Sequence, residues 1–226
     1  MPFETADSAF LSGILEKIAG DVALAFSYQA EDVVALHLAR AQTVRPVQVF
    51  TLDTGRLFPE TNAYHAELEA FFGIDIQRYI PDEPDVRALE KRLGEWGMRH
   101  SLENRHDCCR VRKVDPLRRA LQGKSAWITG LRAAQSVTRT NLQKLEFDDN
   151  NGLIKINPLA DWSDERLFDY ISRCHLPLHP LYAKNFKSIG CAPCTRAVEP
   201  HEDIRAGRWW WENPEHKECG LHLKEV

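Results

Sequence analysis

Short apolar runs alternate with longer stretches of helical periodicity along most of the chain. Four runs have the length and composition of buried strands, at residues 21–26, 46–52, 74–80 and 126–129. Apolar residues that recur every three or four positions predict helices over residues 8–19, 30–41, 59–72, 85–96, 107–121 and 163–174. Strands and helices that alternate at this spacing indicate parallel βαβ units. The pattern therefore predicts an α/β fold with an open, mostly parallel, doubly wound sheet.

Local signals mark several element boundaries. Ser8 and Ser163 stand where helix N-caps are expected, and Pro59 suits the first turn of a helix. The segments 145–147 and 152–156 flank a polar stretch and are expected to pair as a hairpin. Beyond about residue 180 the pattern is irregular. We therefore expect one domain over residues 1–226, with residues 180–226 as an irregular C-terminal tail.

Three loops that follow predicted strands, 27–31, 53–58 and the stretch from Gly130, are polar or contain Gly. In an open α/β sheet, ligands bind beyond the carboxyl ends of the strands. The first loop, SYQAED (27–32), enters a helix N-terminus, which favours an anion. It is similar to the PP-loop SGGxDS of ATP pyrophosphatases but lacks the central Gly. Fewer glycines and the added Glu31 disfavour a triphosphate, so a nucleotide with one phosphate fits better; an ordinary polar loop is the alternative.

Composition narrows the class of protein. With 43% hydrophobic and 27% charged residues the chain is an ordinary globular protein, and its net charge of −4 argues against nucleic-acid binding. Its N-terminal residues lack the basic region, apolar run and small-residue cleavage site of a secretory signal, and no apolar run approaches the ~20 residues that span a bilayer. Six cysteines without a secretory signal favour thiols or metal ligands over disulfides. We expect a cytoplasmic protein.

Four of the cysteines form two close pairs, Cys108-Cys109 and Cys191-x-x-Cys194. Four thiolates match the ligand count of either a cubane iron–sulfur cluster or a structural zinc ion. Cys219, in the terminal sequence KECGLH, is left without such a partner.

Basic residues gather in three places although the chain is acidic overall. The first group surrounds Cys108 and contains Arg99, Arg105, Arg110, Arg112, Lys113, Arg118 and Arg119. Lys113 follows Cys109 by four residues and is expected on the same helix face, whereas most of the others are expected to be solvated. The second group is Arg132 and Arg139, and the third is Arg205 and Arg208. Three basic rims suggest a small, strongly anionic ligand. The adjacent tryptophans 209–211 are expected to pack the tail onto the sheet.

With these residues in view, the chain resembles the assimilatory sulfonucleotide reductases (the PAPS/APS reductase family), specifically the bacterial adenylyl-sulfate reductases of the iron–sulfur type. The matching motifs run in one order through most of the chain: SYQAED (27–32), LDTGRLFPET (52–61), CCRVRK (108–113), GLRAAQSVTR (130–139), SIGCAPCTR (188–196), RAGRWWWE (205–212) and KECGLH (217–222). The fold implied is a PP-loop-like α/β domain.

The resemblance also implies a reaction and its residues. Cys108, Cys109, Cys191 and Cys194 would ligate one 4Fe–4S cluster, and Cys219 would be the nucleophile. Ser27, Asp32, Leu52, Gly130 and Arg139 would line the nucleotide pocket, while Lys113, Arg205, Arg208 and His222 would face the phosphosulfate or the approaching tail. The implied activity is reduction of adenosine 5′-phosphosulfate (APS) to sulfite and AMP. It would proceed through an S-sulfonate on Cys219, with thioredoxin or glutaredoxin as reductant.

Three other functions remain open from the residues. The same chemistry on the 3′-phosphorylated nucleotide PAPS, alone or beside APS, fits the same motifs. A PP-loop ATP pyrophosphatase or tRNA thiolation enzyme is a second alternative, against which the lost glycines and Cys219 argue. A non-catalytic zinc or iron–sulfur sensor is the third, but it would not need Cys219.

Overall fold

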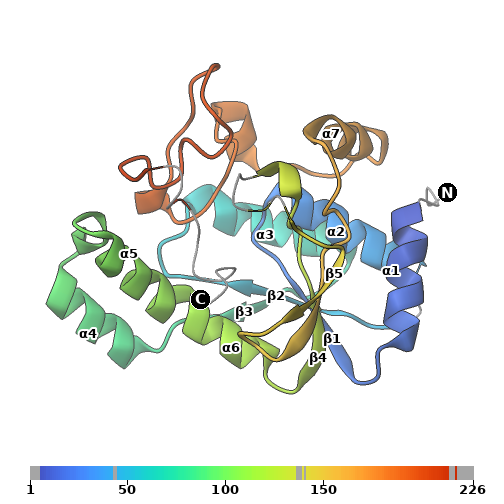
Figure 1. Cartoon of the computed structure of the whole chain (residues 1–226). Helices are drawn as coiled ribbons and strands as arrows, with labels where there is room; N and C mark the ends of the chain where they lie inside the picture. Colours follow the sequence, from blue (N-terminus) through green and yellow to red (C-terminus); the bar gives the residue numbers. More distant parts are fainter. Residues whose placement is uncertain (1–5, 43–44, 136–138, 140, 214–216, 218–226) are drawn as a thin grey trace.

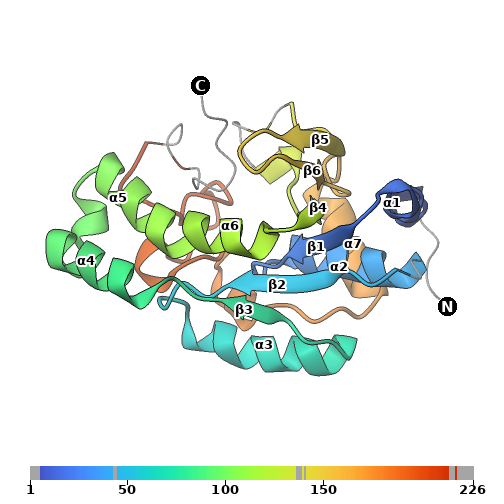
Figure 2. The same ribbon diagram turned by 90° about the horizontal axis from the view of Figure 1, so that it is seen from below.

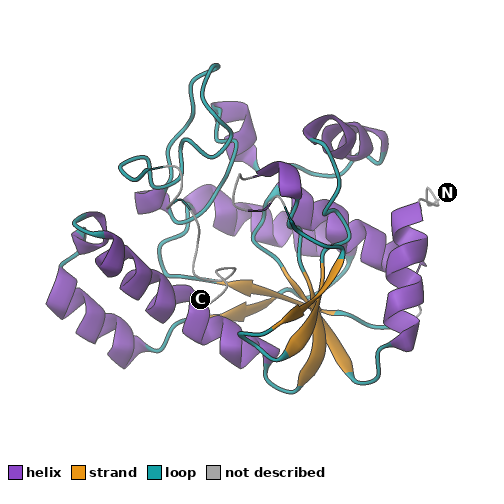
Figure 3. Ribbon diagram, in the orientation of Figure 1, coloured by secondary structure: helices purple, strands orange, loops and turns teal. Residues whose placement is uncertain are grey.

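A computed structural model describes residues 6–42, 45–135, 139, 141–213 and 217. Its centre is a six-stranded sheet in the order β3-β2-β1-β4-β6-β5 (Figures 1 and 3). All neighbouring strands are parallel except β5, which pairs with β6 as the predicted hairpin. The strands are β1 (Asp21–Ala25), β2 (Gln48–Leu52), β3 (Gln77–Tyr79), β4 (Lys124–Ile128), β5 (Leu145–Asp148) and β6 (Leu153–Ile156). The predicted open, mostly parallel α/β sheet is confirmed.

Helices cover both faces of the sheet, as Figure 2 shows for α3 and α6. The helices are α1 (Ala6–Lys17), α2 (Ala30–Gln42), α3 (Pro59–Phe72), α4 (Glu83–Leu93), α5 (Leu102–Cys109), α6 (Asp115–Leu121) and α7 (Asp164–Arg173). Val22 and Leu24 of β1 belong to a core with α1, α2, α3 and α7, whereas Ala23 between them packs toward α6. This alternation along one strand is what a doubly wound sheet requires.

Several helix boundaries differ from the expected ones; α4, for example, ends at Leu93 and not at residue 96. Ser163 caps α7 as predicted, with its Oγ accepting from the N–H of Arg166 at 3.2 Å. Ser8 does not cap α1, because the helix begins at Ala6 and Ser8 lies buried inside it. The expected helix over 107–121 is α5 and α6 joined by a π-helical turn, Arg110–Val114. Such turns are frequent at functional sites, and this one carries Lys113.

The segment after α7 is mostly loop and lies over the carboxyl-end side of the sheet (Figures 1 and 3). Backbone groups of this segment bind the α/β part of the chain. The N–H of Ala192 donates to Arg56 O at 2.8 Å, and Pro193 O accepts from the side-chain Nη2 of Arg99 at 2.6 Å. Trp209 packs among Met98 and three cysteines rather than on the sheet, so the expected position of that tryptophan is wrong.

None of the helices that the structure describes has the length and apolar character needed to cross a bilayer.

Candidate functional site

A cavity of about 160 Å³, which we call the strand-end cavity, lies beyond the carboxyl ends of β1, β2 and β4. The loops after these strands form one wall, and tail residues that include Gly190 and Cys191 form another. The structure brings all five expected nucleotide residues to its lining: Ser27, Asp32, Leu52, Gly130 and Arg139. Parallel strands place their following loops at one edge, which is why residues more than a hundred positions apart meet here.

The loop after β1 keeps a Gly-like backbone without a glycine. Tyr28 stands at a PP-loop Gly position with φ 68°, a left-handed conformation that L-residues adopt at a cost of roughly 1–2 kcal/mol. Its side chain is buried, and its hydroxyl hydrogen-bonds His65 Nδ1 at 2.8 Å. These contacts hold the strained backbone, so the loop shape is retained by packing instead of by glycine.

Asp32 stabilises this loop through hydrogen bonds with Ser27. Its Oδ2 accepts from the backbone N–H and the hydroxyl of Ser27, both at 2.6 Å. Burial raises the pKa of Asp32 to about 7, although the two Ser27 donors oppose that shift. This carboxyl group in the cavity lining is therefore about half protonated near pH 7, which reduces its repulsion of an anionic ligand.

Gly130 is required by a close approach between two loops. A Cβ at this position would lie 2.4 Å from Asp32 Oδ1 and 2.9 Å from the backbone nitrogen of Asp32. The loop after β4 therefore contacts the N-terminus of α2 directly, and any side chain would push the two walls of the cavity apart.

Four basic side chains also line the strand-end cavity: Lys113, Arg139, Arg205 and Arg208. Arg208 is buried and stacks on Trp209, with 4.5 Å between its Cζ and the ring centroid. It also lies close to Gly190, where a Cβ would be 2.5 Å from Arg208 Nη2. Arg139 Nη1 donates to Gln135 Oε1 at 2.6 Å. The arrangement can bind several anionic oxygens at once.

Other basic residues lie elsewhere than expected. Arg132 is not on the cavity rim, because its side chain is buried in ion pairs with Glu31 and Asp164. Arg105 and Arg112 are buried as well, whereas the sequence suggested a solvated face. Arg105 pairs with Glu212, and Arg112 donates to Thr54 O at 2.7 Å and to Glu90 at 2.6 Å.

A second, smaller cavity, which we call the thiol cavity, is lined by Cys108, Cys109, Cys191 and Cys194. The tail thus delivers one cysteine pair to the other, across some 80 residues of sequence. The thiol cavity shares Lys113, Cys191, Arg208 and Trp209 with the strand-end cavity, so the two adjoin. Burial raises the pKa of the Cys108 thiol and raises that of Cys194 to about 12.

The side chains around the thiol cavity suit an anionic iron–sulfur cluster. Arg112 Nε, Arg208 Nε and Trp209 Nε1 are buried donors that have no hydrogen-bond partner among the described residues. All three residues line the cavity, and Thr54 Oγ1 lies 3.3 Å from Cys191 Sγ. Sulfur atoms of a thiolate-ligated cluster accept such hydrogen bonds. Within the described ranges, no three His, Cys, Asp or Glu side chains are grouped closely enough to hold a single metal ion. The fit rests on the four cysteines and the buried N–H donors that line one cavity.

Cys219 and His222 lie outside the described residues. The last described residue is Lys217, whose carbonyl accepts from Arg205 Nη2 at 2.8 Å. Because Arg205 lines the strand-end cavity, the described tail reaches the site two positions before Cys219 in the sequence.

Tyr28, Thr54 and Gln135 shape the site but could not be assigned from the sequence, and Trp209 was assigned another role. All four fall inside matched motifs, SYQAED, LDTGRLFPET, GLRAAQSVTR and RAGRWWWE, but a motif match assigns no role without the spatial partner.

Comparison with known proteins places the chain in a family. Residues 21–197 match the family model described as the phosphoadenosine phosphosulfate reductase domain. The chain belongs to this family. A relative named adenosine 5′-phosphosulfate reductase, from Allochromatium vinosum, is 48% identical over 98% of this chain and 86% of its own length. The resemblance to the sulfonucleotide reductases is thus confirmed.

Solved structures of this reductase family and of other nucleotide enzymes share the fold. Phosphoadenylyl-sulfate reductase from Candida auris, in a phosphate complex, superposes with a TM-score of 0.68 at 24% identity, over 86% of this chain and 91% of that one. Yeast FAD synthetase in complex with FAD gives a TM-score of 0.57 at 17% identity, over 86% and 65% of the two chains. These identities are informative about the fold alone, and they agree with the predicted PP-loop-like architecture.

Proposed function

We propose that this protein reduces APS to sulfite and AMP, with a thioredoxin-type dithiol as electron donor. One observation carries the proposal: the cation-lined strand-end cavity adjoins the four-cysteine cavity and shares Lys113, Cys191, Arg208 and Trp209 with it. The relatives named APS reductase support APS as the substrate.

The lining combines residues of two kinds. Ser27, Asp32 and Gly130 lie at the α2 N-terminus, where backbone N–H groups suit the AMP phosphate, and Leu52 adds an apolar side chain from the end of β2. Lys113, Arg139, Arg205 and Arg208 supply the positive charge that a sulfate esterified to a phosphate requires. Cations fixed before the reaction stabilise charge that develops on the phosphate as it leaves, which is usually the largest catalytic contribution.

In the proposed reaction, the Cys219 thiolate attacks the sulfur of APS. The bond between that sulfur and the bridging oxygen breaks, AMP leaves with the electron pair, and Cys219 carries an S-sulfonate. A thiolate of the reductant then attacks the Cys219 sulfur, releasing sulfite and forming a mixed disulfide. The second thiol of the reductant resolves this disulfide, so the dithiol supplies both electrons and Cys219 is regenerated. His222 and nearby cations would favour the thiolate of Cys219.

Cys108, Cys109, Cys191 and Cys194 would hold a 4Fe–4S cluster in the thiol cavity. When bound, the cluster would supply an electrostatic and structural element beside Lys113, because both chemical steps are two-electron thiol reactions. Lys113 and Arg208 line both cavities, so these two cations would face cluster and phosphosulfate together. The buried N–H groups of Arg112 and Trp209 would orient the cysteine sulfurs.

In this proposal, residues 1–226 form one reductase domain, and the tail from about residue 180 completes the site. The protein would act in the reducing cytoplasm, since Cys219 has to be a free thiol to react.

The test is sulfite release from APS and from PAPS in parallel, with thioredoxin, for wild type and Cys219→Ser. Sulfite from APS that the substitution abolishes supports the proposal. Equal use of PAPS would keep the mechanism and overturn the substrate. No sulfite from either nucleotide, with ATP converted to AMP instead, would replace the reductase proposal by an ATP pyrophosphatase.

A further inference from the structure

We infer that Arg132 acts as a positioning residue for anion binding: it neutralises Glu31, a carboxylate in the wall of the strand-end cavity. The inference rests on the proposed function, in which that cavity takes the phosphate of a sulfonucleotide. Arg132 does not itself line the cavity, whereas Glu31 does. Its effect on a ligand would therefore pass through Glu31.

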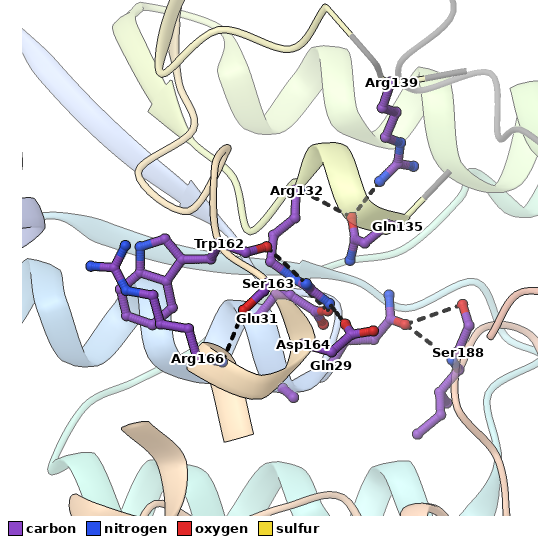
Figure 4. Close-up of polar contacts among 12 residues, drawn as sticks. Gln29, Glu31, Arg132, Gln135, Arg139, Trp162, Ser163, Asp164, Arg166 and Ser188 are labelled. Carbon is purple, nitrogen blue, oxygen red and sulfur yellow. Dashed lines mark hydrogen bonds and ion pairs between the residues drawn. The ribbon is translucent and has the colours of Figure 1, made fainter. Parts of the chain in front are cut away.

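Arg132 lies at the centre of a buried polar network that joins three segments of the chain (Figure 4). Its Nε and Nη2 donate to Glu31 Oε1 at 3.1 and 2.7 Å. The same Nη2 donates to Asp164 Oδ1 at 2.6 Å, and Nη1 donates to Trp162 O at 3.1 Å. The side chains of Arg132 and Glu31 are 2% and 9% exposed, so water screens their charges poorly.

Glu31 is a liability for an anion site unless its charge is cancelled. The described lining contains two carboxyl groups, Glu31 and Asp32. Asp32 has a pKa raised by burial to about 7 and can be neutral at that pH. The Glu31 carboxylate has a guanidinium partner at 2.7 Å, which it shares with the half-exposed Asp164, and a pair of opposite charges exerts only a weak field on a nearby phosphate. The repulsion that Glu31 suggests in the sequence is thus offset by a residue about a hundred positions away.

Arg132 also ties the loop after β4 to α7 through Trp162 and Asp164, so a plain loss of binding would not separate charge from architecture. The separation comes from two ligands that differ only in the charged phosphate group. AMP and adenosine share base and ribose, but adenosine carries no phosphate. A charge effect through Glu31 weakens AMP binding and leaves adenosine binding unchanged, whereas a displaced loop weakens both.

The experiment is calorimetric titration of the full-length protein with AMP and with adenosine. The variants are Arg132→Met, Glu31→Gln/Arg132→Met, Glu31→Gln and Arg132→Lys. Arg166→Met is the matched control, because Arg166 stacks on Trp162 at 4.2 Å in the same network and is absent from the cavity lining. Glu31→Gln and Arg132→Lys keep the test valid if Arg132→Met does not fold.

We expect Arg132→Met to weaken AMP about tenfold, as an uncompensated charge near a phosphate would, and to change adenosine binding less than about twofold. Removing both charges in the double variant restores AMP binding to within about threefold of wild type. We expect Glu31→Gln and Arg132→Lys to bind AMP about as tightly as wild type, because neither variant has a carboxylate at position 31 without a cationic partner.

Equal losses of AMP and adenosine, or a double variant no better than Arg132→Met, would overturn the inference and leave Arg132 a structural residue. So would unchanged AMP binding in Arg132→Met. A wild-type protein that bound neither ligand would instead overturn the proposed function, on which the inference rests.

Discussion

One buried ion pair anchors the tail beside the thiol cavity. Breaking this ion pair is the sharpest test of how the site is held together. Arg105 Nε and Nη2 donate to the two carboxylate oxygens of Glu212, both at 2.9 Å. The Arg105 side chain is fully buried, that of Glu212 is 9% exposed, and the guanidinium lies 4.7 Å from the ring centroid of Trp209. Glu212→Gln keeps the shape of the side chain but replaces one acceptor by a donor and removes the negative charge from the buried pair.

Breaking one partner of a buried pair costs about 3–5 kcal/mol. Because the substituted amide keeps one acceptor, we expect the lower end, about 3 kcal/mol, which lowers the melting temperature of a chain this size by roughly 6–12 °C. The matched control is Glu202→Gln. Glu202 also accepts two bonds from one arginine, Arg196, both at 2.7 Å, but that pair is partly exposed to solvent.

Thermal unfolding followed by circular dichroism, with trypsin cleavage in the tail as a second readout, measures both variants. We expect Glu212→Gln to melt lower and to be cleaved faster, with Glu202→Gln close to wild type. Equal effects of the two substitutions would show that burial does not set the strength of the tail anchor, and would refute the reasoning.

Three further predictions concern the cavities. Gly130→Ala should weaken AMP binding about tenfold in a calorimetric titration, because its Cβ would lie 2.4 Å from Asp32 Oδ1, while Gly13→Ala in α1, with open space around it, should bind normally. Burial raises the pKa of Asp32 from 3.8 to about 7, so the folded protein retains a proton that the unfolded chain loses. The free energy of unfolding should therefore fall between pH 4 and 7, with a limiting slope of about 1.4 kcal/mol per pH unit. Urea titrations of Asp32→Asn should not show this fall in the free energy of unfolding. Cys191→Ser should reduce iron and acid-labile sulfide in anaerobically purified protein, whereas Cys174→Ser, away from the thiol cavity, should retain both; iron content unchanged by Cys191→Ser would remove that residue from the ligand set.

The sheet and the position of the strand-end cavity could be predicted because local patterns determine them. Apolar runs such as residues 21–26 are buried on both faces in a doubly wound sheet, and parallel pairing brings the loops that follow them to one edge. The four cysteines were also predictable as a set, since two pairs without local partners suggest one shared site.

Partners across long sequence distances could not be predicted. Charge alone does not tell that Arg132 pairs with Glu31 or that Arg105 pairs with Glu212, so the sequence predicts a cationic rim for Arg132 and a solvated face for Arg105. The π-helical turn at Arg110–Val114 leaves the helical periodicity of the sequence nearly unchanged. Tyr28 adopts a left-handed backbone conformation, which tyrosine normally avoids.

The central claim is that Cys219 takes the sulfonate group from APS. The most direct measurement mixes the anaerobic protein with APS in the absence of any reductant, then determines the intact mass, the modified peptide and the AMP released. We predict one SO₃ adduct per chain on the peptide that contains Cys219, one equivalent of AMP, and neither in Cys219→Ser. AMP release without a covalent adduct, or an adduct that persists in Cys219→Ser, would contradict the mechanism.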